Sequence, residues 1–307
     1  MFSDPGSTMS KPTVSLVLGS GGARGLAHIG VLEVLVERGF AVRSIAGTSM
    51  GALVGGVYAA GGLQVYTDWV LALERMDVLR LLDLSFARNS LFRGERVIGA
   101  LRQLIGDPDI ESLPLSFTAV ATDLERGREV WLRRGPMFAA IHASIAMPMI
   151  FAPVHLGERL LVDGGLVNPV PVSPTLSDLT DLTVAVNVNG KSLPQPPAAP
   201  LPQAAESAAP RRDLIRRFID DLQSRRGRPE EVRSGLFDIV SRSMDTMESA
   251  IARYRLAAYS PDVLIEVPRN LCAFHEFHRA RELIAAGRHH AALALDTWEN
   301  GRLRPRS

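Results

Sequence analysis

The pentapeptide Gly47-Thr48-Ser49-Met50-Gly51 constrains the fold more than any other part of the chain, because it fits a sharp turn from a strand into a helix. Apolar residues precede it, and an uncharged segment rich in small residues follows it. Glycine on both sides of the turn leaves room for a backbone bend that a side chain would obstruct. The pattern predicts that Ser49 is held clear of the backbone at a helix N-terminus as a candidate nucleophile.

Two further glycine-rich turns follow apolar runs. Gly19-Ser20-Gly21-Gly22-Ala23-Arg24-Gly25 follows residues 14–18, and Asp163-Gly164-Gly165 follows residues 160–162. The first turn opens a predicted helix, where backbone N–H groups and the helix dipole favour an anion. The second turn presents an acid, although Asp-Gly alone is a common structural turn. A nucleophile on an elbow, a donor loop and an acidic partner together indicate a hydrolytic site.

These segments, in this order and spacing, resemble the patatin-like phospholipase family, which includes bacterial patatin-like serine acyl hydrolases and the patatin domain of neuropathy target esterase. The similarity covers roughly residues 13–190. It extends to two further stretches, Ala143-Ser144-Ile145-Ala146-Met147-Pro148 with Phe151 and Pro153, and Asn168 with Pro169. One position departs from the family pattern, because Ser20 stands where glycine is frequent. The later glycines, Gly21 and Gly22, are intact.

The resemblance implies a catalytic dyad in which Ser49 is the nucleophile and Asp163 accepts its proton. It also implies an oxyanion hole at Gly21, Gly22 and Ala23, whose backbone N–H groups can approach an anion closely. The residues expected to support these motifs are Arg24, Gly25, Gly47, Gly51, Gly164 and Gly165. An aspartate with the usual pKa of about 3.9 is a weak base, so this dyad requires desolvation of Asp163. Arg24 either steadies the loop or faces an anionic head group, and the sequence leaves both open.

The implied activity is hydrolysis of lipid carboxylic esters, as a phospholipase A or lysophospholipase, through a covalent acyl-enzyme and without a cofactor. Lipid esters are the expected substrates, and peripheral contact with a membrane is expected. A formal net charge of +1 gives no reason to expect nucleic acid as a partner. A dinucleotide loop and a P-loop both fit poorly: Gly47-Thr48-Ser49 stands where the first needs an acid, and Leu26-Ala27 where the second needs Lys-Ser/Thr.

Two alternatives remain open. One is an α/β-hydrolase with a Ser-Asp-His triad, in which a late residue such as His275 is the base, although that fold usually has several strands before its elbow. The other is a catalytically idle regulatory protein on the same fold. The remaining histidines favour neither a base nor a metal site: His28 and His142 lie in helical patterns, His155 on a strand or loop, His278 outside any H-E-x-x-H spacing, and His289 with His290 in a polar stretch.

Hydrophobic periodicity predicts a three-layer α/β/α sandwich with a largely parallel central sheet. The expected strands cover residues 14–18, 44–46, 115–122, 128–132, 183–188 and 261–267. The expected helices cover residues 26–38, 50–60, 71–84, 93–105, 138–146, 236–258 and 283–298, the last interrupted at Gly287. Residues 44–67 carry no charge, but their glycines favour a buried helix over a membrane span.

Composition divides the chain into four predicted parts: a disordered extension (1–12), a catalytic core (13–190), a Pro/Ala-rich linker or insertion (191–212), and a C-terminal helical segment (213–307) whose edge strand packs on the core. The basic stretch 211–228 suits either an anionic membrane surface or packing on the core. A single cysteine, Cys272, is expected to be buried and suits a reducing compartment. We therefore expect a cytoplasmic protein that contacts the inner membrane surface peripherally.

Overall fold

The computed structural model describes residues 11–74, 94–148, 150–193 and 229–303. The chain divides into two compact units, one made of Met1–Ser192 with Met247–Ser307 and the other of Leu193–Thr246. The first unit contains the sheet and all the residues discussed below as a site. The predicted basic stretch 211–228 and nearly all of the predicted linker 191–212 lie outside the described residues.

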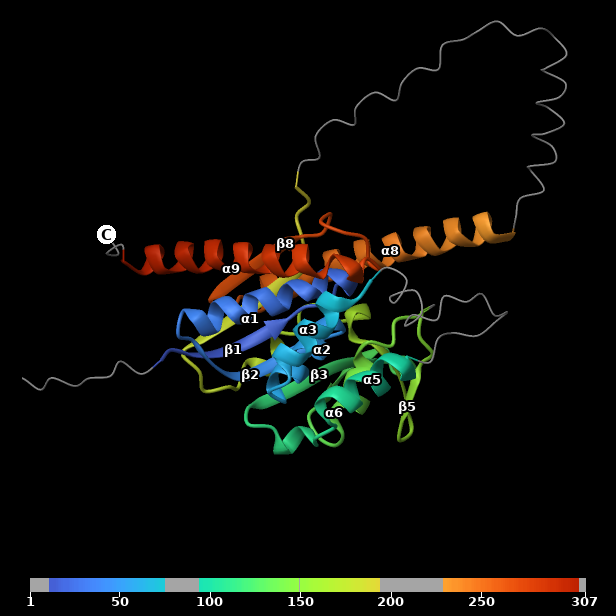
Figure 1. The fold of residues 1–307 in the computed structure, drawn as a ribbon, viewed down its shortest axis with the longest axis horizontal. Coiled ribbons are helices and arrows are strands. Elements are labelled where there is room, and N and C mark those ends of the chain that lie inside the picture. Colours follow the sequence, from blue (N-terminus) through green and yellow to red (C-terminus); the bar gives the residue numbers. More distant parts are fainter. Residues whose placement is uncertain (1–10, 75–93, 149, 194–228, 304–307) are drawn as a thin grey trace, which may run out of the picture. The chain divides into compact units, whose positions relative to one another are not determined.

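The first unit is built on a mixed sheet whose described strands run in the order β5-β6-β3-β2-β1-β7-β8, with β4 paired to β3. The strands are β1 Thr13–Leu18, β2 Ala41–Thr48, β3 Ser116–Asp123, β4 Arg128–Leu132, β5 Val154–Leu156, β6 Arg159–Asp163, β7 Leu182–Gly190 and β8 Val263–Pro268. The five neighbouring strands β3, β2, β1, β7 and β8 are parallel to one another. The antiparallel pairs are β4 with β3, β6 with β3, and β5 with β6. The largely parallel sheet predicted from the sequence is therefore confirmed (Figure 1).

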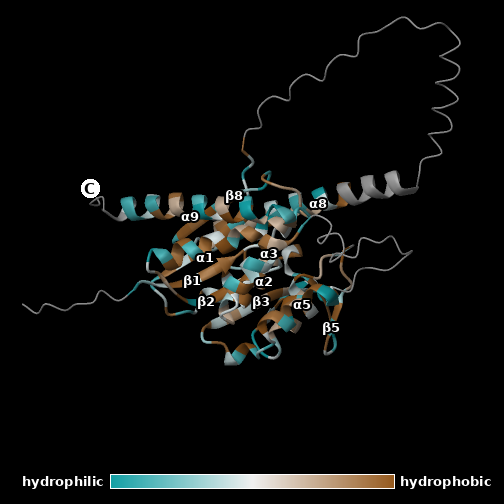
Figure 2. Cartoon of the chain, viewed as in Figure 1, coloured by the Kyte–Doolittle hydropathy of each residue, from teal (hydrophilic) through white to brown (hydrophobic). Residues whose placement is uncertain are grey.

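Helices cover both faces of this sheet. They are α1 Ala27–Glu37, α2 Met50–Ala59, α3 Leu63–Ala72, α5 Glu95–Ile105, α6 Met137–Ser144, α8 Pro229–Ala258 and α9 Ala280–Leu303. Alternate residues of one strand face opposite layers, since Leu16 and Leu18 join the core formed with α1, α2 and α9, while Val17 joins Ala252 of α8. This alternation produces the three-layer α/β/α sandwich. In Figure 2 the hydrophobic colouring concentrates on the central strands.

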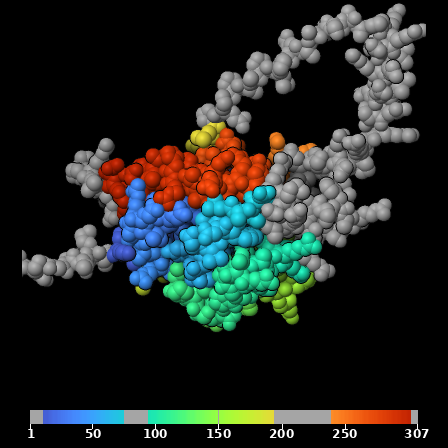
Figure 3. All heavy atoms as spheres, viewed as in Figure 1, coloured from blue at the N-terminus to red at the C-terminus, as the bar shows by residue number. Residues whose placement is uncertain are grey.

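The packing of α9 on α1 corrects the predicted interruption at Gly287, because α9 is continuous through this residue. A Cβ on Gly287 would lie 1.9 Å from Ala27 O, and a Cβ on Gly30 would lie 2.1 Å from Ile284 O. The glycines therefore allow two helix backbones to approach closely, which offsets their low helix propensity. Figure 3 shows α9 lying along α1.

A second correction concerns the predicted helix 71–84. The structure instead has α3 at Leu63–Ala72, and Leu73 is already extended with φ −71° and ψ 122°. Residues 75–84 lie outside the described residues. The uncharged segment after the elbow forms the buried helix α2 as predicted. No helix in the described ranges has the length and hydropathy required to cross a bilayer.

Candidate active site

Ser49 lies between the end of β2 and the first residue of α2 with φ 56° and ψ −124°. It is the one non-glycine residue with positive φ in the described part of the chain, a conformation that costs free energy and is typical of functional sites. Both flanking glycines are required sterically. A Cβ on Gly51 would lie 2.1 Å from Leu18 O, and a Cβ on Gly47 would lie 2.4 Å from Gly51 O. The predicted strand–turn–helix elbow is therefore present.

Hydrogen bonds from neighbouring elements hold this elbow in place. The Ser49 amide donates to Ser144 Oγ at 2.9 Å, and Ser144 Oγ donates to Val120 O at 2.6 Å. Thr48 Oγ1 donates to Asn168 O at 2.9 Å. Ser144 lies at the end of α6 and is fully buried, so it links the elbow to β3. Sequence reasoning assigned Ser144 no such role, because the contact spans 95 residues.

Asp163 is the hydrogen-bond partner of the Ser49 hydroxyl. Ser49 Oγ donates to Asp163 Oδ2 at 2.6 Å, although 114 residues separate the two. Strand β6 runs antiparallel to β3 and ends at Asp163, where Gly164 begins a short helical turn. A Cβ on Gly164 would lie 2.2 Å from Val120 O, so only glycine fits there. The Gly165 amide donates to Asp163 Oδ1 at 2.7 Å and orients the carboxylate.

Burial makes Asp163 a stronger base than an ordinary aspartate. Ser49 is 7% exposed and Asp163 is 4% exposed. Desolvation raises the pKa of Asp163 to about 6, although the hydrogen bonds from Ser49 and Gly165 lower it. The pair therefore combines a short hydrogen bond with a carboxylate whose proton affinity suits proton transfer near neutral pH.

The glycine loop lies between the end of β1 and the start of α1, and its backbone hydrogen-bonds to several other segments. The Gly19 amide donates to Val186 O at 3.0 Å, and the Ser20 amide to Pro169 O at 2.8 Å. The Ala23 amide donates to Phe274 O at 2.8 Å. Within the described residues, the amides of Gly21 and Gly22 donate to no other group. Two of the three amides predicted to form an oxyanion hole therefore remain available to an anion.

Arg24 ties this loop to β7 and to the segment around Cys272. Its side chain is 3% exposed. Nε and Nη2 donate to Asn189 Oδ1 at 3.2 and 2.8 Å, and Nη1 donates to Cys272 O at 3.5 Å. Asn189 lies near the end of β7 and was not singled out from the sequence, since no local pattern marks it.

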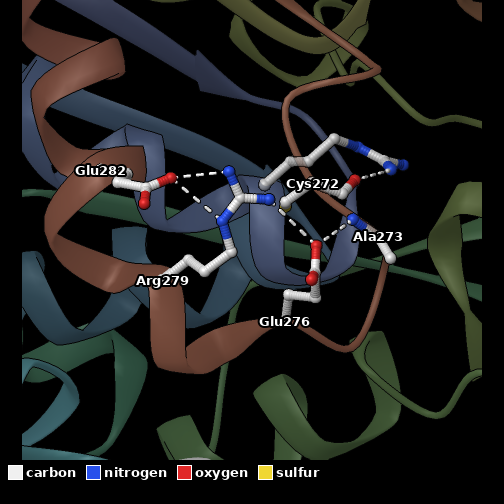
Figure 4. A network of polar contacts seen from close by, with 6 residues as sticks. Cys272, Ala273, Glu276, Arg279 and Glu282 are labelled. Carbon is white, nitrogen blue, oxygen red and sulfur yellow. Dashed lines mark hydrogen bonds and ion pairs between the residues drawn. The ribbon is translucent and has the colours of Figure 1, made fainter. Parts of the chain in front are cut away.

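Residues 272–276 form a segment that covers the loop. Glu276 Oε2 accepts hydrogen bonds from the Ala273 amide at 2.7 Å and from Arg279 Nη1 at 3.1 Å, and Arg279 also binds Glu282 (Figure 4). The Phe274 ring packs against the loop, because a Cβ on Gly22 would lie 2.2 Å from it. Cys272 is buried as predicted, and burial raises the pKa of its thiol to about 11.

No histidine of the described residues hydrogen-bonds to Ser49 Oγ, whose partner is Asp163. His28 Nε2 is 2.8 Å from Gly19 O, and burial lowers the pKa of this imidazole to about 4. His275 is exposed on the covering segment. The others are half-buried or exposed: His142 on α6, His155 on β5, His278 before α9, and His289 and His290 on α9. Among the described side chains, no three histidine, cysteine or acidic groups gather as a metal site.

Comparison with known proteins identifies similar sequences and similar solved structures. A family model described as patatin-like phospholipase matches residues 16–176. An uncharacterized NTE family protein of Mycobacterium bovis is 41% identical over 335 residues, covering 94% of this chain and 93% of that protein. Lysophospholipase nte1 of Emericella nidulans is 32% identical over 179 residues, covering 57% of this chain and 12% of that protein. VipD from Legionella pneumophila aligns with a TM-score of 0.43 at 13% identity, covering 94% of this chain and 67% of that chain. The family match spans both Ser49 and Asp163.

Proposed function

The chain belongs to the patatin-like phospholipase family, and on that premise we propose that it is a serine acyl hydrolase that cleaves carboxylic ester bonds of lipids. The observation that carries the proposal is the 2.6 Å hydrogen bond from Ser49 Oγ to a buried Asp163 whose pKa is raised to about 6. A serine hydroxyl needs such a base to become nucleophilic. Ser49 is the proposed nucleophile and Asp163 the proposed proton acceptor.

In the first half of the proposed reaction, Asp163 Oδ2 takes the Ser49 hydroxyl proton while Oγ attacks the ester carbonyl carbon. The carbonyl oxygen gains the negative charge in the tetrahedral intermediate. The bond to the leaving alcohol then breaks, and Asp163 returns its proton to that alcohol. Ser49 is left as an acyl ester, and Asp163 is again a carboxylate.

Gly21 and Gly22 are the proposed oxyanion donors, because their amides donate to no other group of the described residues and neither residue has a side chain that would obstruct an anion. Preorganised backbone donors stabilise charge that develops in the transition state, typically by about 3–4 kcal/mol for one donor. Ala23 becomes a third donor only if its amide releases Phe274 O. The proposed hole therefore has two donors.

In the second half, water replaces the alcohol. Asp163 takes one proton from the water as its oxygen attacks the acyl carbon, and the same two amides bind the second oxyanion. The bond between the acyl carbon and Ser49 Oγ breaks, and the proton on Asp163 returns to Oγ. The products are a free carboxylic acid and the original enzyme, so no cofactor enters the reaction.

We propose phospholipids or lysophospholipids as the substrates. Family membership supports lipid esters, and the relative from Emericella nidulans is itself called a lysophospholipase. The low exposure of Ser49 and Asp163 also supports this class, because a long acyl chain helps to exclude the water that would weaken the base. Peripheral contact at the inner membrane surface of the cytoplasm remains part of the proposal, as does the division of the chain into core, linker and C-terminal segment.

The test is product analysis combined with active-site labelling. The purified protein is incubated with phosphatidylcholine, lysophosphatidylcholine and p-nitrophenyl esters of short and long acyl chains, with and without EDTA. We expect release of fatty acid from lipids, a preference for medium or long chains, and no effect of EDTA. Activity confined to acetyl esters would contradict the lipid assignment. An absence of both turnover and fluorophosphonate labelling would favour an idle protein on this fold.

A further inference from the structure

Glu248 is a buried carboxylate on α8 that the reaction above does not use. Glu248 is 6% exposed to solvent. Oε2 accepts a hydrogen bond from Ser20 Oγ at 2.7 Å and another from Asn189 Nδ2 at 3.4 Å. Ser20 and Glu248 are 228 residues apart, so the fold alone brings them together. Ser20 directly precedes the two proposed oxyanion donors.

The other oxygen of Glu248 faces the turn that carries Asp163. A Cβ on Gly165 would lie 2.7 Å from Glu248 Oε1 and 3.1 Å from Asp163 Oδ1. Asp163 Oδ2 binds Ser49, so Oδ1 is the oxygen on the side of Gly165. Glu248 therefore packs behind the proposed base and at the same time holds the glycine loop.

The hydrogen-bond network continues beyond Glu248. Asn189 Nδ2 donates to Ser20 O at 3.1 Å, while Asn189 Oδ1 accepts from Arg24. Burying a carboxylate is unfavourable unless hydrogen bonds compensate for the lost hydration, and an apolar side chain would fill the same space at a lower cost in free energy. Ala252, one turn later on α8, is apolar and fully packed. The position of Glu248 between two motifs of the site therefore indicates a role beyond packing.

We propose that Glu248, acting through Ser20, is a positioning residue that sets the distance between the Gly21 and Gly22 amides and the Asp163 turn. The inference rests on the proposed function, because this distance affects the reaction only if those amides bind the oxyanion. Donors of this kind act only when they lie close to the charge that develops in the transition state. Displacing the loop should therefore lower kcat more than it raises KM.

The test compares Ser20→Ala, Glu248→Ala, Glu248→Gln and the double variant Ser20→Ala/Glu248→Ala, assayed with a long-chain p-nitrophenyl ester. We expect each alanine variant to lose about tenfold in kcat, with KM changed less than about twofold, as for a weakened oxyanion donor. Glu248→Gln keeps an oxygen that can accept the Ser20 hydroxyl, so it should retain about a third or more of wild-type kcat. The double variant should be no worse than the worse single variant, because both changes break one contact. The control is Glu266→Gln, the same substitution at an exposed residue of β8.

Hydrogen exchange of the peptide covering residues 19–26 provides a readout that needs no activity. Its amides should exchange faster in both alanine variants than in the wild type, with Glu248→Gln and Glu266→Gln unchanged. The inference would be overturned if the alanine variants had the same kcat and the same exchange rates as the wild type. So would a glutamine variant as impaired as the alanine variant, since charge would then be responsible instead of the hydrogen bond. Failure of the proposed function differs from both results: the wild type would hydrolyse no ester, while exchange would still report on the loop.

Discussion

The two halves of the candidate site are held in different ways. In the half that carries Ser49 and Asp163, backbone atoms enclose the glycines, since a Cβ on Gly47, Gly51 or Gly164 would collide with main-chain atoms, and Ser144 adds a side-chain hydrogen bond to the elbow. The half that carries the glycine loop depends on side chains and carbonyls from distant segments, among them Asn189, Glu248 and Phe274. Main-chain contacts leave no freedom for substitution, whereas side-chain contacts can be weakened in steps. We therefore expect all-or-none effects in the first half and graded effects in the second.

The largest expected effect in the first half is that of Ser49→Ala. Without a nucleophile the acyl-enzyme cannot form, and hydrolysis should fall by about 10³-fold or more. Fluorophosphonate labelling should disappear while the thermal unfolding midpoint changes little, because alanine has the same Cβ. Ser112→Ala, at an exposed hydroxyl, is the matched control. Labelling that persists in Ser49→Ala would place the nucleophile on another residue.

Asp163→Asn should separate activity from stability. Asparagine keeps the shape but cannot accept the Ser49 proton, so activity should fall by about 10²–10⁴-fold. The pKa of Asp163 is raised by burial, so its charged form destabilises the folded protein above pH 6, and this cost disappears as the pH falls toward 4. The variant should therefore unfold at a higher temperature than the wild type at pH 8, and the difference should shrink at pH 4.

Equal midpoints at pH 8, or activity above a tenth of the wild-type value, would contradict the assignment of Asp163 as a desolvated base. Asp68→Asn, at an exposed residue of α3, controls for a general effect of removing one negative charge.

The pH dependence of the wild type should show the same group directly. Asp163 must be deprotonated to accept a proton, and its pKa is about 6. Below pH 6, kcat/KM should therefore fall by about tenfold for each pH unit, with a plateau above pH 7. The measurement is kcat/KM from pH 4 to 9, with fluorescence confirming that the protein stays folded. An acidic limb near pH 4 would mean that the base is not desolvated during turnover.

The same contrast explains what the sequence could predict. Ser49 and Asp163 lie in short patterns that are visible in the sequence, since each has glycines within two residues, and both are predicted as site residues without coordinates. The distant backbone atoms that make glycine necessary at Gly51 and Gly164, Leu18 O and Val120 O, are visible only in the fold. The largely parallel sheet also followed from local apolar runs. Asn189 and Glu248 carry no local signal, because their roles arise from contacts with residues 165 and 228 positions away.

The errors in the element predictions have a related cause. Gly287 was expected to interrupt a helix, because helix propensity is a local quantity. The contact with Ala27 O that makes glycine necessary there is visible only after α1 and α9 pack together. Local patterns therefore predict the elements and motifs, but tertiary contacts decide where glycine breaks a helix and where it joins two.

A moderate effect is expected from Gly22→Ala in the second half. Gly22 has φ 54°, and a Cβ there would lie 2.2 Å from the Phe274 ring, which is a movable side chain. We expect a loss of about tenfold in kcat, because the loop must shift by a few tenths of an ångström or more. Adding Phe274→Ala should restore part of the loss by removing the clash. A double variant worse than Gly22→Ala would show that the ring supports the loop more than it restricts it.

The smallest expected effect is that of His275→Gln, which tests the triad alternative. His275 is exposed on the segment that covers the glycine loop, while Ser49 Oγ already donates to Asp163 Oδ2. A triad would require the imidazole to lie between these two groups, and their 2.6 Å separation leaves no room for it. The variant should therefore keep kcat/KM within about twofold of the wild type and show the same pH profile. A loss comparable to that of Asp163→Asn would mean that the covering segment rearranges during turnover and that histidine is the base. The activity of this variant, compared with that of Asp163→Asn, therefore distinguishes a dyad from a triad.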